Sequence, residues 1–310
     1  METPRRRAIR LLLDREAYAP GETLRGTVEV DWPRPLPVRG VRVELAGAEE
    51  TRITVSRGSG KNRRSTTYTE RDEIIAEGYV LFGGRGVSGL QAVGEAFKRL
   101  LKPLDYPLLP AGRHRYDFEF HIPPDALPSF EGTHARVAYD LSARVDVPLG
   151  RDLVFEGTLA VVNPETLRIA PYRARGTRPA GGLLRAFRAE LGLELELDGC
   201  RLIPGERLEG HLLVRNHSRK KIRGARISLM GVEKAEAGGH EREETFEIAR
   251  GYLPAPDPAA ETQDIRFGIK LDPCPVPYAG RYSRVDLFLA AGLDIAMAFD
   301  AEIEVPLGIE

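Results

Sequence analysis

The chain has 310 residues, of which 42% are hydrophobic and 29% are charged. These values are typical of a folded globular protein and exclude an intrinsically disordered one. The 45 basic and 46 acidic residues leave a formal net charge of -1, so no overall field attracts nucleic acid or an anionic membrane. At this length two domains are expected.

The N-terminal residues give no sign of a targeting segment. Three arginines at 5–7 are followed by only three consecutive leucines at 11–13, too few for the apolar core of a signal peptide. Nowhere does the sequence reach the ~20 consecutive apolar residues that a membrane-spanning helix needs. The two cysteines, Cys200 and Cys274, form no Cys-x-x-Cys motif, which indicates a reducing setting. We therefore expect a cytoplasmic protein.

Apolar residues alternate with polar ones along most of the chain. Leu24, Val28 and Val30 follow this pattern, and the segments 116–122 and 137–147 repeat it. A period of two predicts half-buried strands. Because no helices alternate regularly with these strands, the sequence predicts an all-β protein of antiparallel sandwiches rather than a parallel α/β sheet.

The segment 56–108 interrupts this pattern in the first half of the chain. Its polar part, 56–72, predicts a mobile hairpin tip. Its later part, 90–101, predicts one amphipathic helix, because its apolar residues lie at helical spacing. These residues are Leu90, Val93, Phe97 and Leu101.

The same segment contains a pattern that resembles a nucleotide-binding motif. Residues 84–89 read Gly-Arg-Gly-Val-Ser-Gly. A dinucleotide site needs these glycines inside a β-α-β unit, whereas here prolines and an antiparallel strand follow. The sequence His240-Glu241-Arg242-Glu243 lacks the second histidine of a zinc-binding H-E-x-x-H motif. We expect no cofactor, no metal and no catalytic activity.

An internal repeat divides the chain in two. At an offset of 184 residues, 12 of the 34 positions at 14–47 are identical to those at 198–231, and Pro-Gly-Glu at 20–22 recurs at 204–206. A period this long predicts duplicated domains rather than a solenoid. We expect domains at 1–165 and 191–310, joined by a linker at 166–190, where Pro171, Pro179 and the pair Gly181-Gly182 interrupt the strand pattern.

Three segments resemble the arrestin-like family, which includes α-arrestins, the arrestin-fold subunit of retromer and bacterial sporulation-control proteins. Residues 14–26, from Asp14 to Gly26, resemble the opening of the α-arrestin N-terminal domain, and 109–123 followed by Pro-Ser-Phe-Glu-Gly at 128–132 is similar to its most diagnostic stretch. Ile-Pro-Gly-Glu at 203–206 looks like the start of the C-terminal domain. No Pro-Pro-x-Tyr motif for ligase recruitment is present.

The resemblance implies two tandem immunoglobulin-like sandwiches and a non-catalytic adaptor. Its partner would be a protein, such as the cytoplasmic tail of a membrane protein, bound at a sheet edge or on the concave face between domains. Membrane contact would be peripheral at most, and nucleic acid is not expected. One alternative is a ligand-binding or carbohydrate-binding protein, or a hydrolase, with a cleft between its domains; another is a regulator that self-associates through edge strands.

Basic residues form two candidate binding clusters for an anion or an acidic partner. Animal arrestins sense phosphate through basic residues on their first strand, and four arginines lie near the corresponding position in this sequence. The second cluster belongs to the predicted hairpin tip, where the alternative is a solvated loop. The candidate residues are Arg5, Arg6, Arg7, Arg10, Arg57, Lys61, Arg63 and Arg64.

Overall fold

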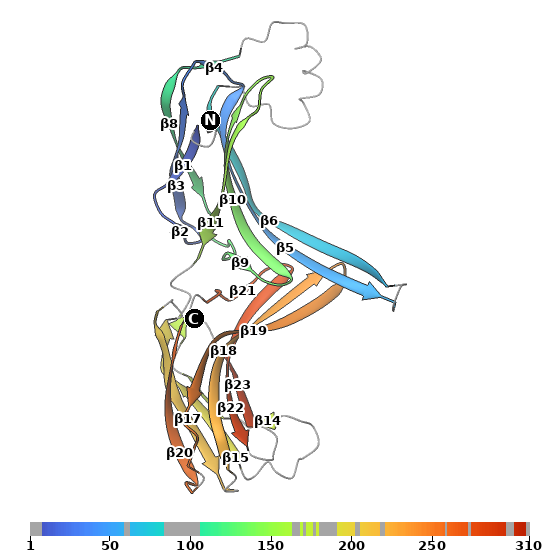
Figure 1. Cartoon of the computed structure of the whole chain (residues 1–310), viewed down its shortest axis with the longest axis vertical. Coiled ribbons are helices and arrows are strands. Elements are labelled where there is room, and N and C mark those ends of the chain that lie inside the picture. Colours follow the sequence, from blue (N-terminus) through green and yellow to red (C-terminus); the bar gives the residue numbers. More distant parts are fainter. Residues whose placement is uncertain are drawn as a thin grey trace, which may run out of the picture. The chain divides into compact units, whose positions relative to one another are not determined.

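The computed structural model describes most of the chain (Figure 1). The described residues are 8–58, 63–83, 106–162, 168–169, 172–175, 178–179, 191–201, 205–217, 221–257, 259–271, 274–295 and 301–307. All regular structure among them is β-strand, which confirms the predicted all-β class. The helix predicted at 90–101 and the glycine-rich motif at 84–89 lie outside the described residues.

The first half of the chain supplies two main sheets. One sheet has the order β1-β3-β8 and consists of β1 (Ile9–Leu13), β3 (Thr23–Trp32) and β8 (Gly112–His121). The other has the order β2-β11-β10-β5-β6 and consists of β2 (Ala17–Tyr18), β11 (Leu153–Val161), β10 (Ala135–Asp146), β5 (Gly40–Arg57) and β6 (Arg64–Phe82). Shorter pairs add β9 (Phe130–Glu131) to β10, and β4 (Leu36–Pro37) to β7 (Leu108–Leu109).

The second half of the chain supplies a similar pair of sheets. One has the order β13-β15-β17-β20 and consists of β13 (Tyr172–Arg175), β15 (Leu191–Leu197), β17 (Arg207–Asn216) and β20 (Thr262–Lys270). The other has the order β14-β23-β22-β18-β19 and consists of β14 (Arg178–Pro179), β23 (Ala301–Pro306), β22 (Ser283–Ile295), β18 (Ile222–Ala237) and β19 (His240–Leu253). Shorter pairs join β21 (Tyr278–Ala279) to β22, and β12 (Arg168–Ile169) to β16 (Cys200–Arg201).

The alternation of residue types explains why these segments are strands. In β10 every second side chain is buried, from Ala135 to Val145, and the intervening ones are exposed or half-buried. Tyr139 is fully buried in this row, and its hydroxyl donates to the carbonyl oxygen of Leu127 at 2.6 Å, so its polar atom is satisfied. Burial of such rows between facing sheets supplies the main driving force for the fold.

The internal repeat predicted from the sequence reappears as repeated geometry. Gly21 and Gly205 both adopt a positive φ, at 82° and 90°, and each donates its N–H to the carbonyl of the residue that directly follows a strand, Ile122 after β8 or Leu271 after β20. Glycine adopts this conformation without the strain that a Cβ would introduce. The ion pairs of the two copies also correspond, since Arg39 binds Asp146 at 2.9 Å and Arg223 binds Asp294.

The described contacts divide the chain into two compact units, each of which consists of three separate segments of the sequence. The first unit contains 1–49, 71–129 and 137–162, and the second contains 50–70, 130–136 and 163–310. The second unit therefore includes the distal halves of β5 and β6 and the segment Phe130–Arg136. The predicted boundaries at 165 and 190 remain a prediction.

The β5–β6 hairpin is more ordered than the sequence predicted. Residues 64–72, expected in a mobile tip, belong to strand β6. Within the second unit, the Tyr68 ring lies 4.7 Å from the His240 ring, and the Gly238 N–H donates to the Glu70 carboxylate at 3.2 Å. The prediction was wrong for this segment because its polar composition concealed contacts with a turn more than 160 residues away.

A buried glutamate holds Phe130–Arg136 within the second unit. Glu233 on β18 is 1% exposed, and its carboxylate accepts the backbone N–H groups of Thr133, His134 and Ala135 at 2.8, 2.7 and 2.5 Å. Three N–H donors compensate the desolvation of a buried carboxylate. Gly132 leaves room for this group, since a Cβ there would lie 2.7 Å from Glu233 Oε1.

Candidate binding surface

The outer face of the β1-β3-β8 sheet is a ladder of paired charges. Strands β3 and β8 are antiparallel neighbours, and each outward residue on β3 faces an oppositely charged or hydrogen-bonding residue on β8. The Arg115–Glu29 pair is 2.7 Å apart, and Arg25–Glu119 and Arg113–Asp31 are each 3.6 Å apart. These pairs neutralise most of this face, so its capacity to bind a partner depends on what β1 adds.

Strand β1 adds an arginine and an exposed leucine to this face. Arg10 lies opposite Glu29 and Leu12 lies opposite Thr27 in the register of β1 with β3. Arg10 is exposed, and Leu12 is 49% exposed. Because the two residues are two positions apart on one strand, they point to the same side of the sheet.

The backbone of β1 has an edge with which no described strand pairs, although β11 lies near β1. The Asp14 N–H donates to the Arg25 carbonyl, and the Asp31 N–H donates to the Ala8 carbonyl, so the even-numbered residues of β1 direct their backbone groups toward β3. The N–H and carbonyl groups of Ile9, Leu11 and Leu13 therefore point away from β3. No described strand pairs with them. An unpaired edge of this kind can accept an extended peptide as an added strand.

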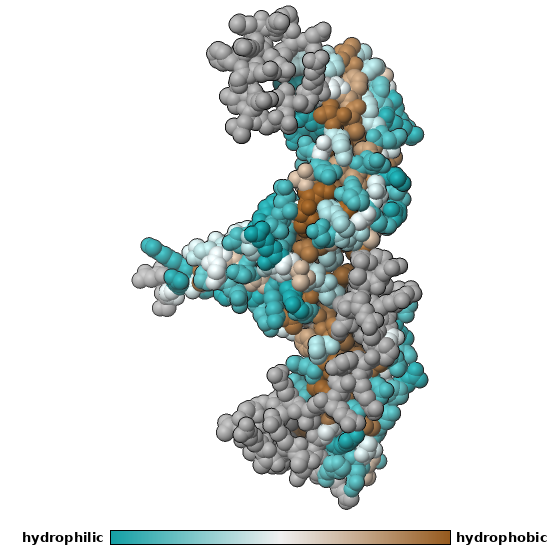
Figure 2. All heavy atoms as spheres, turned by 180° about the vertical axis from the view of Figure 1, so that it is seen from behind, coloured by the Kyte–Doolittle hydropathy of each residue, from teal (hydrophilic) through white to brown (hydrophobic). Residues whose placement is uncertain are grey.

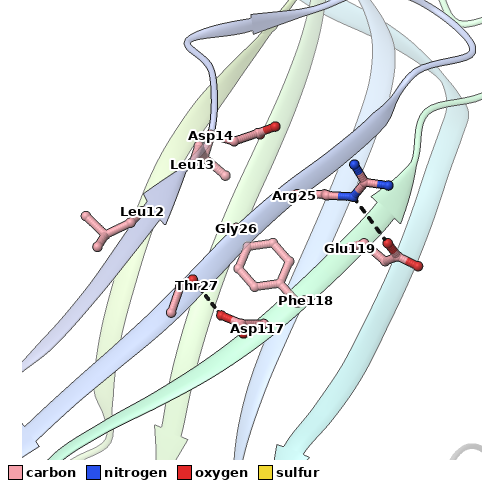
Figure 3. A pocket seen from close by; sticks show the side chains of 9 residues that line it. All are labelled: Leu12, Leu13, Asp14, Arg25, Gly26, Thr27, Asp117, Phe118 and Glu119. Atoms are coloured by element: carbon pink, nitrogen blue, oxygen red, sulfur yellow. Dashed lines mark hydrogen bonds and ion pairs between the residues drawn. The ribbon is translucent and has the colours of Figure 1, made fainter.

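A groove follows the same three strands (Figure 3). Its volume is about 610 Å³, and it is lined by three cross-strand rows. Gly26 lies at its centre, where the Phe118 ring crosses the space that a side chain would occupy: a Cβ on Gly26 would be 2.6 Å from Phe118 Cζ. The lining residues are Leu12, Leu13, Asp14, Arg25, Gly26, Thr27, Asp117, Phe118 and Glu119.

A hydrogen-bonded network fixes the end of β1 beside this groove. The hydroxyl of buried Tyr18 donates to Asp14, which lowers the pKa of that carboxyl, and burial raises the pKa of Tyr18 to about 12. The Ala19 N–H donates to Glu22 at 2.8 Å and lowers the pKa of that carboxyl, which also accepts from Arg15 at 3.0 Å. Both carboxylates are thus ionised at neutral pH, and the network holds the chain as it leaves β1.

The predicted binding residues fall in different parts of the structure. Arg10 lies on β1 in the first unit. Arg57, Arg63 and Arg64 lie together at the end of the β5–β6 hairpin in the second unit, all exposed, and Arg63 donates to Ser56 Oγ at 3.2 Å. Arg5, Arg6, Arg7 and Lys61 lie outside the described residues.

The exposed position of Leu12 at a sheet edge was not predicted from the sequence. The leucines at 11–13 were used only to exclude a signal peptide, whereas the structure makes Leu12 the exposed apolar residue of a sheet edge. The signal was present: three consecutive leucines in a strand must place at least one on the outer face. The edge itself depends on sheet order, which no local pattern reveals.

Neither a metal-ligating cluster nor a reactive thiol is found among the side chains that the structure describes. No group of three or more His, Cys, Asp or Glu side chains in this part of the chain could hold a metal ion. The Cys274 thiol is free, and burial raises its pKa to about 12, so it is a poor nucleophile at neutral pH. Across the same residues, no helix has the length and apolar character needed to cross a bilayer.

Comparison with known proteins identifies the family. Residues 9–168, more than half of the chain, match the family described as arrestin (or S-antigen), N-terminal domain. The chain belongs to the arrestin-like family. The matched part of this arrestin-like chain contains β1, β3 and β8, and therefore the whole candidate surface.

Individual relatives extend this similarity into the second half. Arrestin domain-containing protein 1 of Mus musculus is 30% identical over 140 residues, which cover 45% of this chain and 25% of that protein. Arrestin domain-containing protein 17 of Caenorhabditis elegans is 25% identical over 236 residues, covering 73% and 52%. Arrestin domain-containing protein A of Dictyostelium discoideum is 22% identical over 319 positions, covering 97% and 51%. This arrestin-like chain thus spans a quarter to about half of the length of these curated relatives.

Proposed function

We propose that the chain is a non-catalytic cytoplasmic adaptor that binds an extended segment of a partner protein as an added strand on β1. The observation that carries this proposal is the free edge of β1, where Ile9, Leu11 and Leu13 direct unpaired backbone groups away from β3. A flexible segment, such as the tail of a membrane protein, would pair with these groups and complete a four-stranded sheet.

The side chains of β1 favour a partner of defined chemistry. Arg10 would face an acidic residue on the added strand, and Leu12 would face an apolar residue two positions away on the same side. The remaining outward charges on β3 and β8 are already paired. The partner motif that fits is therefore an acidic and an apolar residue separated by one residue, with the acidic residue first on a parallel added strand and the apolar residue first on an antiparallel one.

The opposite edge of this sheet fits an added strand less well. Strand β8 alternates exposed charged residues, Arg113, Arg115, Asp117 and Glu119, along its length. Charged side chains on an edge strand are a common protection against pairing with another chain. Strand β1 has no such protection at Leu11, Leu12 and Leu13, which favours it as the binding edge.

A proline substitution tests strand addition directly. Leu11→Pro removes the N–H that points to the free edge and leaves the bonds to β3 intact, since proline fits edge strands when its N–H side faces solvent. Leu11→Ala is the matched control for the loss of the side chain. An array of 12-residue peptides that carry this motif in either order, together with scrambled versions that contain neither order, would be probed with each purified chain.

We expect the peptides that wild type selects to bind Leu11→Pro at least tenfold more weakly than wild type, because one backbone hydrogen bond and the fit of its neighbours are lost. Their affinity for Leu11→Ala should stay within about threefold of that for wild type, because this variant keeps the backbone N–H. Equal binding by Leu11→Pro would refute strand addition. Selection of scrambled peptides equally well would refute the motif. Self-association through the same edge would appear instead as dimers in light scattering that Leu11→Pro dissolves.

A further inference from the structure

A tight turn between β10 and β11 holds a leucine in a conformation that leucine rarely adopts. Leu149 has a φ of 57° and is the one non-glycine residue with positive φ among those described. The Gly150 N–H donates to the Val147 carbonyl at 3.2 Å, which closes a four-residue turn with Pro148 in its second position. Proline followed by a positive φ is typical of a type II turn, whose third position favours glycine or asparagine.

This conformation is imposed by the structure around it. The Val147 N–H donates to Asp152 Oδ1 at 2.9 Å, so the turn is tied on both sides. A side chain with a Cβ is disfavoured in the left-handed region by about tenfold relative to glycine. Leu149 is nevertheless fully exposed, at 103%, so no packing within the described structure compensates for this strain. A strained residue that stabilises nothing points to a role at the surface.

Other apolar residues are exposed at the same end of the first unit. Arg39 joins the end of β10 to the segment before β7. Its N–H donates to the Asp146 carbonyl, and its guanidinium lies 5.8 Å from the centre of the Tyr106 ring. The adjacent β4–β7 pair exposes Leu108, at 56%. Figure 2 shows hydrophobic side chains at the upper end of the molecule, where Figure 1 places β4, with hydrophilic ones beside them. We call Arg34, Leu108, Leu149 and Arg151 the apical surface.

The charge of the apical surface is positive. Asp146 is paired with Arg39 at 2.9 Å, and Asp152 accepts the Val147 N–H and lies 3.9 Å from Arg144. Arg34 and Arg151 are exposed and form no ion pair with a described residue. A projecting leucine with one free arginine two positions after it, Arg151, and a second, Arg34, on the segment that leads into β4 fits a layer that is apolar within and negatively charged at its surface.

We infer that the apical surface docks on an anionic lipid bilayer, with Leu149 inserted among the acyl chains and Arg34 and Arg151 at the headgroups. A protein pocket would need walls that match one projecting side chain, whereas a bilayer accepts Leu149 and Leu108 together and attracts the unpaired arginines. A contact of this size is weak and reversible, since stable anchoring needs more than one signal. It would place β1, in the same unit, near the tails of membrane proteins.

The test uses the residue that the turn itself prefers. Leu149→Gly relieves the strain and so should raise the midpoint of urea unfolding, followed through Trp32, the only tryptophan of the chain, which lies in the same unit. A loss of binding in this variant therefore does not come from unfolding. The full chain would be sedimented with vesicles of phosphatidylcholine alone and of phosphatidylcholine with phosphatidylserine.

We expect wild type to sediment with the phosphatidylserine vesicles and Leu149→Gly to bind them about tenfold more weakly. Arg151→Glu should also weaken the binding, through loss of the electrostatic attraction that added salt screens in wild type. Tyr252→Ser, at an exposed aromatic residue on β19 in the second unit, is the control for loss of an exposed apolar side chain elsewhere and should bind as wild type. Wild type that stays in solution with both vesicles, or Leu149→Gly that binds as wild type, would overturn the inference. So would a Leu149→Gly variant that retains vesicle binding but loses a protein partner, since the occupant would then be a protein pocket.

Discussion

Glu233 shows how one buried charge can organise a segment that is distant in sequence. Its carboxylate accepts three consecutive N–H groups, at 133–135, from the first half of the chain. Glu233→Gln replaces one acceptor oxygen by an amide that can only donate, facing N–H groups that also only donate. We expect the free energy of unfolding to fall by about 2–3 kcal/mol, because a buried charged hydrogen bond is lost and an N–H is left unsatisfied. Urea unfolding followed by circular dichroism would measure this change.

The neighbouring glutamate provides the control for this substitution. Glu244 lies directly opposite Glu233 on β19 and is exposed. Glu244→Gln makes the same chemical change and should alter the free energy of unfolding by less than about 0.5 kcal/mol. Amide exchange at 133–135 should accelerate only in Glu233→Gln. Equal stability of the two variants would show that the three hydrogen bonds are not needed to hold this segment.

Single residues were the hardest part of the structure to predict. Composition and position identified Arg10 as a candidate, but nothing in the sequence around Glu233 distinguishes it from the exposed glutamates of β19. The repeat does provide a hint, since Glu49 occupies the equivalent position and is also fully buried. The strain at Leu149 follows from a proline before it and a glycine after it, a turn pattern that was not used in the prediction.

At the scale of strands, a glycine and a phenylalanine recur as a pair in both halves. Gly26 lies opposite Phe118 on β8, and Gly210 lies opposite Phe267 on β20. A Cβ on either glycine would approach the ring and a backbone carbonyl to less than 3 Å. We expect Gly26→Ala and Gly210→Ala each to destabilise the chain by about 1–3 kcal/mol, because a backbone carbonyl cannot move aside without disturbing the sheet.

Gly224 separates this steric effect from the general effect of replacing a glycine. It also lies in a strand segment, a Cβ on it would meet no atom within 4 Å, and it does not have a positive φ. Gly224→Ala should therefore be neutral or slightly stabilising in the same urea experiment. A Gly26→Ala variant as stable as Gly224→Ala would mean that the Phe118 ring moves freely and that the pair does not define the groove.

Strand periodicity predicted the elements well where one face of the strand is buried. The predicted segment 116–122 corresponds to β8, and 137–147 corresponds to β10. The prediction was wrong at 64–72, because β6 is mostly exposed there and its polar side chains do not alternate with apolar ones. Long hairpins with two solvated faces lack the alternation from which strands are predicted.

At the scale of the whole chain, the duplication was visible in the sequence, but the division into units was not. A repeat at an offset of 184 residues predicts that the two halves share one fold, and the matching turns at Gly21 and Gly205 agree with this. The segments 50–70 and 130–136 nevertheless belong to the second unit. Their contacts, such as Thr51 Oγ1 donating to the Glu236 carbonyl at 2.6 Å, join residues more than 180 positions apart and have no local pattern.

This division predicts that the second half of the sequence alone is an incomplete unit. A fragment of residues 163–310 would retain its two main sheets but lack 50–70 and 130–136, leaving Glu233 and the ring of Tyr278, which lies 5.6 Å from the Phe130 ring, without these contacts. We expect amides at 228–237 on β18 to exchange at least tenfold faster in the fragment than in the intact chain, because local opening becomes easier when packed neighbours are removed. Hydrogen exchange with mass spectrometry would measure this, and peptides from β17 and β20 would report whether the fragment is folded. Equal protection of β18 in a folded fragment would show that the second sandwich is complete within its own half of the sequence, and that the segments contributed by the first half add nothing to its stability.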